Sequence, residues 1–189
     1  MKTVKEILLP AVILFAICLV ATTLLALTNQ VTAPVIEKLE SKTAAEARAK
    51  VLPGADSFDA GHTITYNGTE YIYYKGFYKD GELAGFTFTT SAGGYGGDVV
   101  IMTGVGADGA VTGVSALSQS ETPGLGAKAA GNGFLGRFVG KSGIIALSKA
   151  GKAAENGVDA VTGATISSKA VTEAINLALV LYTEVPENG

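Results

Sequence analysis

The segment DAVTGATISSKAV (Asp159–Val171) lies where the chain passes from a loop of small residues into its last apolar helix. Four hydroxyl side chains crowd into seven residues of it: Thr162, Thr165, Ser167 and Ser168. Beyond them, apolar residues recur at helical spacing on one face, namely Val171, Ala174, Ile175, Ala178, Leu179 and Tyr182. The hydroxyl cluster is therefore expected at the N-terminus of this helix.

Two interpretations of the cluster follow from the chemistry of helix ends. The first N–H groups of a helix lack intrahelical partners, and the helix dipole favours negative charge there. One serine or threonine is enough to cap them. Alternatively, Gly163, Ala164 and the following amides form a phosphate site. Hydrolase chemistry is disfavoured, because His62 is the only histidine and neither Ser-x-x-Lys nor Gly-x-Ser-x-Gly occurs.

Upstream of the cluster, apolar and polar residues alternate, which predicts an antiparallel meander. Strands are expected at His62–Tyr66, Glu70–Tyr78, Glu82–Thr90, Asp98–Val105 and Ala110–Leu117. Asn-Gly and Asp-Gly pairs, which are typical of tight hairpin turns, separate several of these strands. A further helix is expected from Ala127 through Phe138. The globular part is thus predicted to be an α+β domain, an antiparallel sheet with flanking helices.

Two glycine-rich segments interrupt the meander. In SAGGYGGDV (Ser91–Val99), glycine allows the backbone to approach a ligand closely, although a plain flexible loop has the same composition. SETPGLGAKA (Ser120–Ala129) ends the last predicted strand. Its Glu121 and Thr122 lie at a strand end, where ligand contacts are common, although a simple turn with an exposed glutamate also fits.

The N-terminal stretch ILLPAVILFAICLVATTLLAL (Ile7–Leu27) is apolar throughout. At 1.5 Å per residue it spans roughly 30 Å, the thickness of the bilayer hydrocarbon. A cleaved signal peptide would have a shorter apolar region followed by a small-x-small site. An uncleaved transmembrane anchor is therefore expected at residues 1–28, with Pro10 in its first turn.

A juxtamembrane stalk helix is expected next, at residues 29–53, with Pro34 in its first turn and Pro53-Gly54 after its end. Residues 54–189 then form the globular domain. Basic residues flank the anchor on both sides, so their positions do not decide its orientation. They are Lys2 and Lys5 before it, and Lys38, Lys42, Arg48 and Lys50 after it.

Composition excludes several classes of function. The net charge of −3 gives no electrostatic footprint for nucleic acid. Cys18 is the only cysteine and lies in the apolar run, so neither a disulfide framework nor a Cys/His metal cluster is expected.

Three segments together resemble the FMN-binding domain family of Rnf complexes and of the sodium-pumping NADH:quinone reductase. Asp159–Thr165 (DAVTGAT) is similar to the flavinylation motif of the family. Glu121–Gly126 (ETPGLG) resembles its second signature, and Gly93–Val99 (GGYGGDV) fits its glycine loop. The order of anchor, stalk, sheet and motifs also matches, so the resemblance covers nearly the whole chain.

The resemblance implies that FMN is attached to Thr165 through a phosphoester bond, which a separate flavin transferase makes from FAD with Mg²⁺. Asp159 is a candidate for presenting the motif to that enzyme, or a plain loop residue. Tyr95, Leu125 and Thr122 are candidates for the slot of the flavin ring. The other residues expected at the cofactor are Thr162, Gly163, Ala164, Glu121, Gly124, Gly126 and Lys128. Lys128 would stabilise reduced flavin if it points inward, and is otherwise an exposed helix lysine.

The compact length favours the Rnf branch of the family. The resemblance then implies a membrane-bound electron carrier in a complex that couples ferredoxin/NAD electron transfer to Na⁺ or H⁺ translocation. Other membrane subunits would be its partners, and no side chain of its own would be catalytic. The family places the flavin domain on the extracytoplasmic side of the cell (inner) membrane, behind one membrane pass with a cytoplasmic N-terminus. Alternatives are a component of the NADH:quinone reductase type, a noncovalent FMN-binding module, and an assembly subunit with an empty motif.

Overall fold

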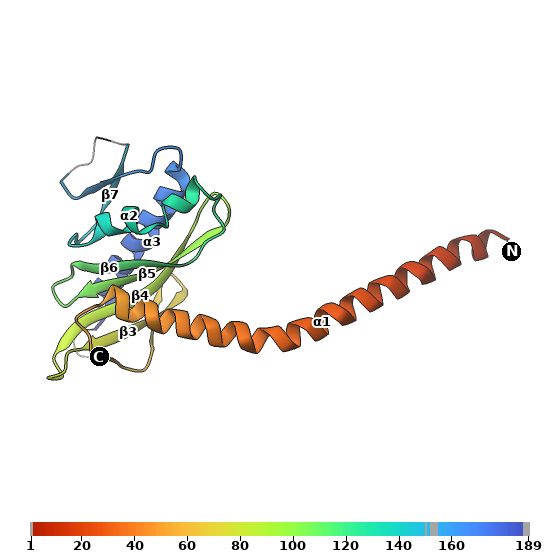
Figure 1. The fold of residues 1–189 in the computed structure, drawn as a ribbon, viewed down its shortest axis with the longest axis horizontal. Helices are drawn as coiled ribbons and strands as arrows, with labels where there is room; N and C mark the ends of the chain where they lie inside the picture. Colours follow the sequence, from red (N-terminus) through yellow and green to blue (C-terminus); the bar gives the residue numbers. More distant parts are fainter. Residues whose placement is uncertain (1, 150, 152–154, 187–189) are drawn as a thin grey trace. The chain divides into compact units, whose positions relative to one another are not determined.

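The structure is a computed structural model that describes residues 2–149, 151 and 155–186. It divides into two units, Met1–Thr43 and Ala44–Gly189. The first unit consists of the greater part of helix α1 (Lys2–Val51), which is drawn in red to orange in Figure 1. From Leu8 onward this helix is long and apolar enough to cross a membrane, and its side chains are exposed as far as Ile36.

Helix α1 is continuous from Lys2 to Val51. Pro10 and Pro34 both lie inside it, so the prediction that each falls in the first turn of a helix is wrong. Each proline removes one backbone hydrogen bond and crowds the carbonyl four residues before it, but the hydrogen bonds on either side continue the helix. As expected, α1 ends just before Pro53, at Val51.

The second unit is built on an antiparallel sheet (Figure 1). Its strand order is β1-β3-β4-β5-β6, and β2 pairs with β3. The strands are β1 (Ser57–Phe58), β2 (His62–Tyr66), β3 (Thr69–Phe77), β4 (Leu83–Gly93), β5 (Asp98–Gly106) and β6 (Val111–Ser118). The five predicted strands are all present, which confirms the α+β prediction. The two-residue β1 and the small parallel pair β7 (Ala146–Ser148) and β8 (Gly157–Asp159) are too short to show alternation in the sequence.

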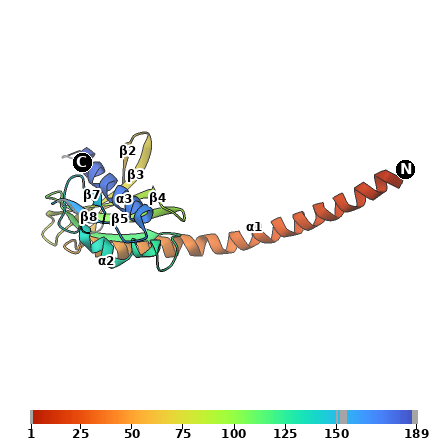
Figure 2. The same ribbon diagram turned by 90° about the horizontal axis from the view of Figure 1, so that it is seen from above.

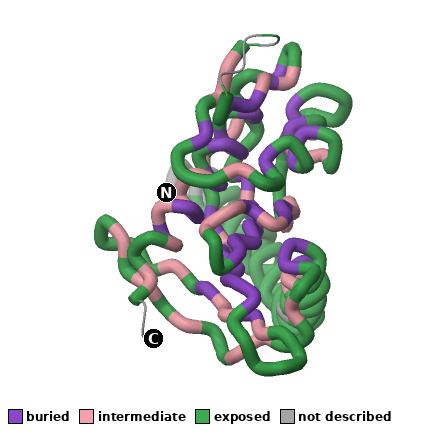
Figure 3. The backbone as a smooth tube through the Cα atoms, turned by 90° about the vertical axis from the view of Figure 1, so that its left-hand side faces the viewer, coloured by how far each residue is buried: buried purple, intermediate pink, exposed green. Residues whose placement is uncertain are grey.

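Helix α3 (Thr165–Glu184) covers one face of this sheet and packs its apolar side against it in the main hydrophobic core. Phe88 and Ile101 of the sheet and Ile175 of α3 are fully buried there. Within the same layer, the Thr90 hydroxyl donates a hydrogen bond to the Ala174 carbonyl at 2.8 Å. Buried residues, purple in Figure 3, follow this interior, whereas the loops around it are mainly exposed. The helix that carries the hydroxyl cluster is therefore fixed to the central strands.

The last two turns of α1 pack on the opposite face, against Met102 (Figure 2). There the backbone of Val51 comes so close to Gly104 and Gly113 that a Cβ on either glycine would collide with it. The Thr112 hydroxyl also donates a hydrogen bond to the Val51 carbonyl at 2.6 Å. The end of α1 is thus an integral part of the globular unit.

The helix predicted from Ala127 through Phe138 is broken into three short turns. These are η1 (Gly126–Lys128), α2 (Asn132–Leu135) and η2 (Gly136–Phe138). Glycine in a helix interior costs about 1 kcal/mol relative to alanine, and three glycines fall within this stretch. Burial of Phe134 and Phe138 fixes the turns to the core instead.

Candidate functional site

Helix α3 begins without a side-chain cap. Its N-cap residue is Ala164, no side-chain hydrogen bond caps the first turn, and that turn contains no acidic residue. The interpretation of the hydroxyl cluster as a simple N-cap is therefore wrong. The N-terminus of α3 keeps unpaired N–H groups and a positive dipole end, which suit an anion.

The four hydroxyls divide into two buried serines and two exposed threonines. Ser167 donates a hydrogen bond to Glu121 Oε2 at 2.8 Å, and Ser168 Oγ accepts one from the Val161 N–H at 3.0 Å. Thr162 and Thr165 are exposed. The serines thus tie the first turn of α3 to two neighbouring loops, while Thr165 presents its side chain at the helix start.

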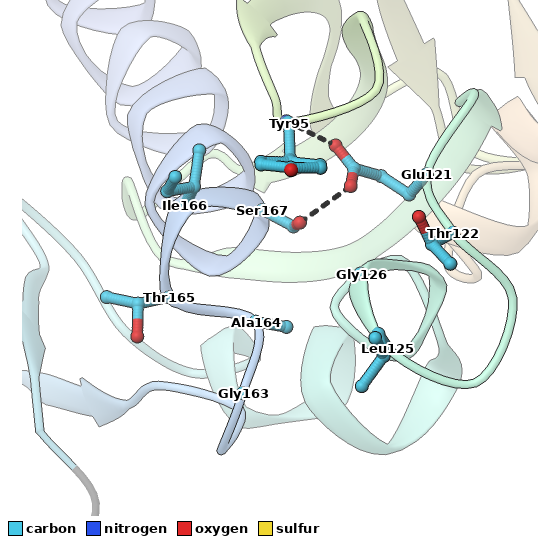
Figure 4. Close-up of a pocket in the computed structure, with 10 residues that line it drawn as sticks. All are labelled: Tyr95, Glu121, Thr122, Leu125, Gly126, Gly163, Ala164, Thr165, Ile166 and Ser167. Atoms are coloured by element: carbon cyan, nitrogen blue, oxygen red, sulfur yellow. Dashed lines mark hydrogen bonds between the residues drawn. The ribbon is translucent and has the colours of Figure 1, made fainter.

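Glu121 is buried, with 5% of its surface exposed, so the expectation of an exposed turn glutamate is wrong. Its Oε1 accepts a hydrogen bond from the backbone N–H of Tyr95 at 2.7 Å, and its Oε2 accepts the bond from Ser167 (Figure 4). Its Oε1 also accepts a hydrogen bond from the backbone N–H of Gly96 at 3.3 Å. Burial raises the pKa of this carboxyl, but the three hydrogen bonds outweigh burial and lower the pKa below its ordinary value. Glu121 is therefore an ionised clamp between the glycine loop and α3.

The glycines of both signature segments make room for this clamp. A Cβ on Gly94 or Gly126 would collide with the Glu121 carboxylate, and one on Gly126 would also lie 2.6 Å from Ser167 Oγ. A Cβ on Gly96 would meet the Ser120 carbonyl. The sequence suggested that these glycines let a ligand approach, whereas the structure shows them packed around a buried side chain of the chain itself.

A cleft of about 430 Å³ opens beside the clamp (Figure 4), within the usual size range of small-molecule sites. Its lining brings together eight of the predicted residues and two others, Ile166 and Ser167. The ten residues are Tyr95, Glu121, Thr122, Leu125, Gly126, Gly163, Ala164, Thr165, Ile166 and Ser167.

Large apolar side chains at this cleft are exposed to solvent. Tyr95 is 75% exposed, and Leu125 and Ile166 are each 54% exposed. Exposed apolar side chains that gather in a concave site are typical of a ligand-binding pocket. Ile166 was missed from the sequence, although it is an apolar residue that falls outside the core-facing stripe of its helix.

Three predicted residues lie outside this cleft. Thr162 lines a second cleft with Leu147 and Lys149, and Thr165 borders both clefts. Gly124 has a positive φ of 81° and open space around it, so it serves the turn. Lys128 is exposed on η1 and does not line the cleft, which agrees with the alternative of an exposed helix lysine.

Asp159 belongs to β8, the strand that leads into the TGAT segment. Its backbone carbonyl accepts a hydrogen bond from Arg137 Nη1 at 3.0 Å. The loop before α3 is therefore tied to η2 as well as to α3 itself.

An open cleft thus lies beside an uncapped helix N-terminus and the exposed side chain of Thr165, an arrangement that suits an aromatic ligand with a phosphate group. The comparison with known proteins specifies the class. Residues 94–180, which include the whole cleft lining, match the FMN-binding domain family, and residues 1–51 match the RnfG N-terminal region.

Relatives of known identity extend along nearly the whole chain. The G subunit of the Na⁺-translocating ferredoxin:NAD⁺ oxidoreductase complex of Acetobacterium woodii is 39% identical, over 90% of this chain and 88% of the relative. The G subunit of an ion-translocating oxidoreductase complex of Methanosarcina acetivorans is 34% identical, over 95% and 96%. The chain therefore belongs to the family of G subunits of ion-translocating oxidoreductase complexes.

A solved structure with the same fold is the C subunit of the Na⁺-translocating NADH-quinone reductase of Parabacteroides distasonis. The TM-score is 0.54 at 26% sequence identity, over 62% of this chain and 64% of that chain. The antiparallel sheet with flanking helices is thus common to this chain and that subunit.

Proposed function

We propose that this chain is the membrane-bound, FMN-carrying electron-transfer subunit of an Rnf-type complex, which couples electron transfer between ferredoxin and NAD to Na⁺ or H⁺ translocation. Its membership of the G-subunit family supports the assignment to the complex. The match to the FMN-binding domain family over the cleft supports the cofactor. Other membrane subunits of the complex are then its partners.

The observation that carries this proposal is the position of Thr165. Its exposed side chain stands at the uncapped start of α3 and borders the cleft (Figure 4). The N–H groups of that first turn would hold the phosphate, and Gly163 and Ala164 bring no bulky side chain to it. Tyr95, Leu125 and Ile166 would contact the flavin ring. The residues present thus fit FMN bound through its phosphate to Thr165.

Attachment requires a transferase and a flavin donor, since no hydrogen bond among the described residues links the Thr165 hydroxyl to a general base. A flavin transferase with Mg²⁺ would bind FAD as the donor. The Thr165 hydroxyl would form the new P–O bond to the flavin-side phosphorus while the P–O bond of the diphosphate breaks. AMP leaves, and the hydroxyl proton passes to a base of the transferase. An exposed Thr165 suits this reaction, because another protein has to reach it.

Bound FMN would supply the redox chemistry, which is electron transfer between neighbouring redox centres. The side chains of this subunit hold and orient it. The two buried serines keep the attachment turn in place, and the Glu121 clamp fixes the glycine loop that bears Tyr95. No residue of the chain has to transfer a proton for this role.

We also propose that α1 crosses the membrane once, with the N-terminus in the cytoplasm and the globular unit outside. Cys18, within α1, is the only cysteine, so a new cysteine at the exposed Lys79 can be labelled selectively. A membrane-impermeant maleimide should label Lys79→Cys in intact cells. Labelling that appears only after lysis would contradict the proposed orientation.

The functional assignment is tested in the assembled complex. Thr165→Ala should leave the subunit in the complex but abolish electron transfer between ferredoxin and NAD in membrane preparations. Thr183→Ala, which changes an exposed threonine at the other end of α3, should retain full activity. Activity of the Thr165→Ala complex equal to that of the unmodified complex would refute the electron-carrier role.

A further inference from the structure

The charge distribution in the cleft is unusual for a site that holds an anionic cofactor. Among the described residues that line it, Glu121 is the one charged side chain, and it is negative. Lys128, the cation that the sequence suggested for this site, is exposed and does not line the cleft. A buried carboxylate in such a place costs free energy unless hydrogen bonds compensate for it, and here they do.

The compensation comes from both walls of the cleft. Tyr95 donates from the glycine loop between β4 and β5, and Ser167 donates from the first turn of α3 (Figure 4). Gly96 donates from the same loop as Tyr95. The three donors are 26, 25 and 46 residues away from Glu121 in sequence. One carboxylate thus connects the glycine loop to the first turn of α3.

We propose that Glu121 is a positioning residue that fixes both walls of the flavin cleft and that its negative charge lowers the reduction potential of FMN bound there. The inference rests on the function proposed above. Each electron that enters the cofactor adds negative charge to the cleft. A fixed carboxylate in a partly dehydrated site opposes that charge more strongly than it would in water. The protein thereby makes the bound flavin a better electron donor.

The substitution Glu121→Gln separates the two parts of this role. An amide keeps the size of the side chain and still offers one oxygen to the N–H groups of Tyr95 and Gly96. Its NH₂ group can donate to Ser167 Oγ, because a hydroxyl can accept as well as donate. The variant therefore preserves the connection between the walls but removes the charge.

The test is a redox titration of the full-length, flavinylated protein in detergent. Glu121→Gln should favour reduction by about tenfold in the equilibrium constant, a rise of about 59 mV for a one-electron couple. One control accompanies it. Glu82→Gln makes the same change in net charge at an exposed turn at the opposite end of β4. This control should not move the potential appreciably.

A second variant covers the case in which Glu121→Gln does not fold. Thr122 is exposed and lines the same cleft, so Thr122→Lys places an opposing charge there without touching the clamp, and should raise the potential too. The inference is overturned if flavin binds but neither variant raises the potential, or if Glu82→Gln raises it equally. A wild-type protein that binds no flavin would instead overturn the proposed function.

Discussion

The substitution Gly126→Ala tests whether the cleft is built around the Glu121 clamp. Gly126 has no positive φ, so its backbone accepts alanine without strain. The added methyl group, however, would collide with Glu121 Oε2 and lie 2.6 Å from Ser167 Oγ. It would enter the space between the two atoms that share the 2.8 Å hydrogen bond.

The expected loss of stability follows from this geometry. Overpacking of a buried site costs roughly 1–3 kcal/mol when the surroundings shift to accept the methyl group. Breaking the hydrogen bond from Ser167 to the carboxylate costs roughly 1.5–3 kcal/mol. The two responses are partly alternatives, so the free energy of unfolding should fall by about 2–4 kcal/mol. For a domain of this size the melting temperature should then fall by roughly 5–15 °C.

Thermal unfolding of the full-length protein in detergent measures this change. The chain has no tryptophan, and Tyr66 is the first of its seven tyrosines, so the tyrosine band of the near-ultraviolet circular dichroism spectrum reports the globular unit alone. Gly133→Ala is the matched control, because a Cβ there meets open space within the short helix α2. The control should melt at or slightly above the wild-type temperature. A Gly126→Ala protein that melts within about 1 °C of the wild type would refute the clamp geometry.

Three further predictions concern the same unit. Gly113→Ala places a Cβ 2.7 Å from Val51 Cα, so it should lower the free energy of unfolding by roughly 1–3 kcal/mol in denaturant titrations, and an unchanged midpoint would contradict the docking of α1. Ser168→Ala removes the acceptor of the Val161 N–H and should cost about 1 kcal/mol and slow flavin attachment, which time-resolved labelling with the transferase would detect. Because the folded pKa of Glu121 is lowered, its stabilisation is complete above its unfolded pKa of about 4.3 and is lost as the pH falls through the folded value. The difference in stability between wild type and Glu121→Gln should therefore shrink as the pH falls below about 5 and through the lowered folded pKa of Glu121, and a difference that grows on acidification would contradict the sign.

Much of the fold could be predicted because its signals are local. Alternation over five to eleven residues and Asn-Gly or Asp-Gly turns define the meander, and a single apolar stripe defines α3. The errors have local causes too. A proline normally indicates the start of a helix, but α1 continues through Pro34. Glycine residues interrupt the helix that was expected from Ala127 through Phe138. The strands β7 and β8 have three residues each, which is too short for a recognisable alternation.

The candidate site was predicted less completely, because its decisive contacts are between distant segments. Eight of the residues that the resemblance named do lie beside one another in the cleft. The resemblance gave no indication that Glu121 is buried or that Ser167 binds it 46 residues away. Local reasoning about SSKAV suggested capping for the serines, whereas tertiary contacts use both of them to hold neighbouring loops. Only the three-dimensional arrangement separates these structural hydroxyls from the exposed Thr165.

The central claim is that Thr165 carries covalently bound FMN. The most direct test is the fluorescence of a denaturing gel under ultraviolet light, with full-length protein made in the presence of a flavin transferase. The wild-type and Thr183→Ala bands should fluoresce, and the Thr165→Ala band should be dark. A dark wild-type band, with the transferase shown to be active on another substrate, would contradict covalent attachment, and a fluorescent Thr165→Ala band would contradict the assignment of the residue.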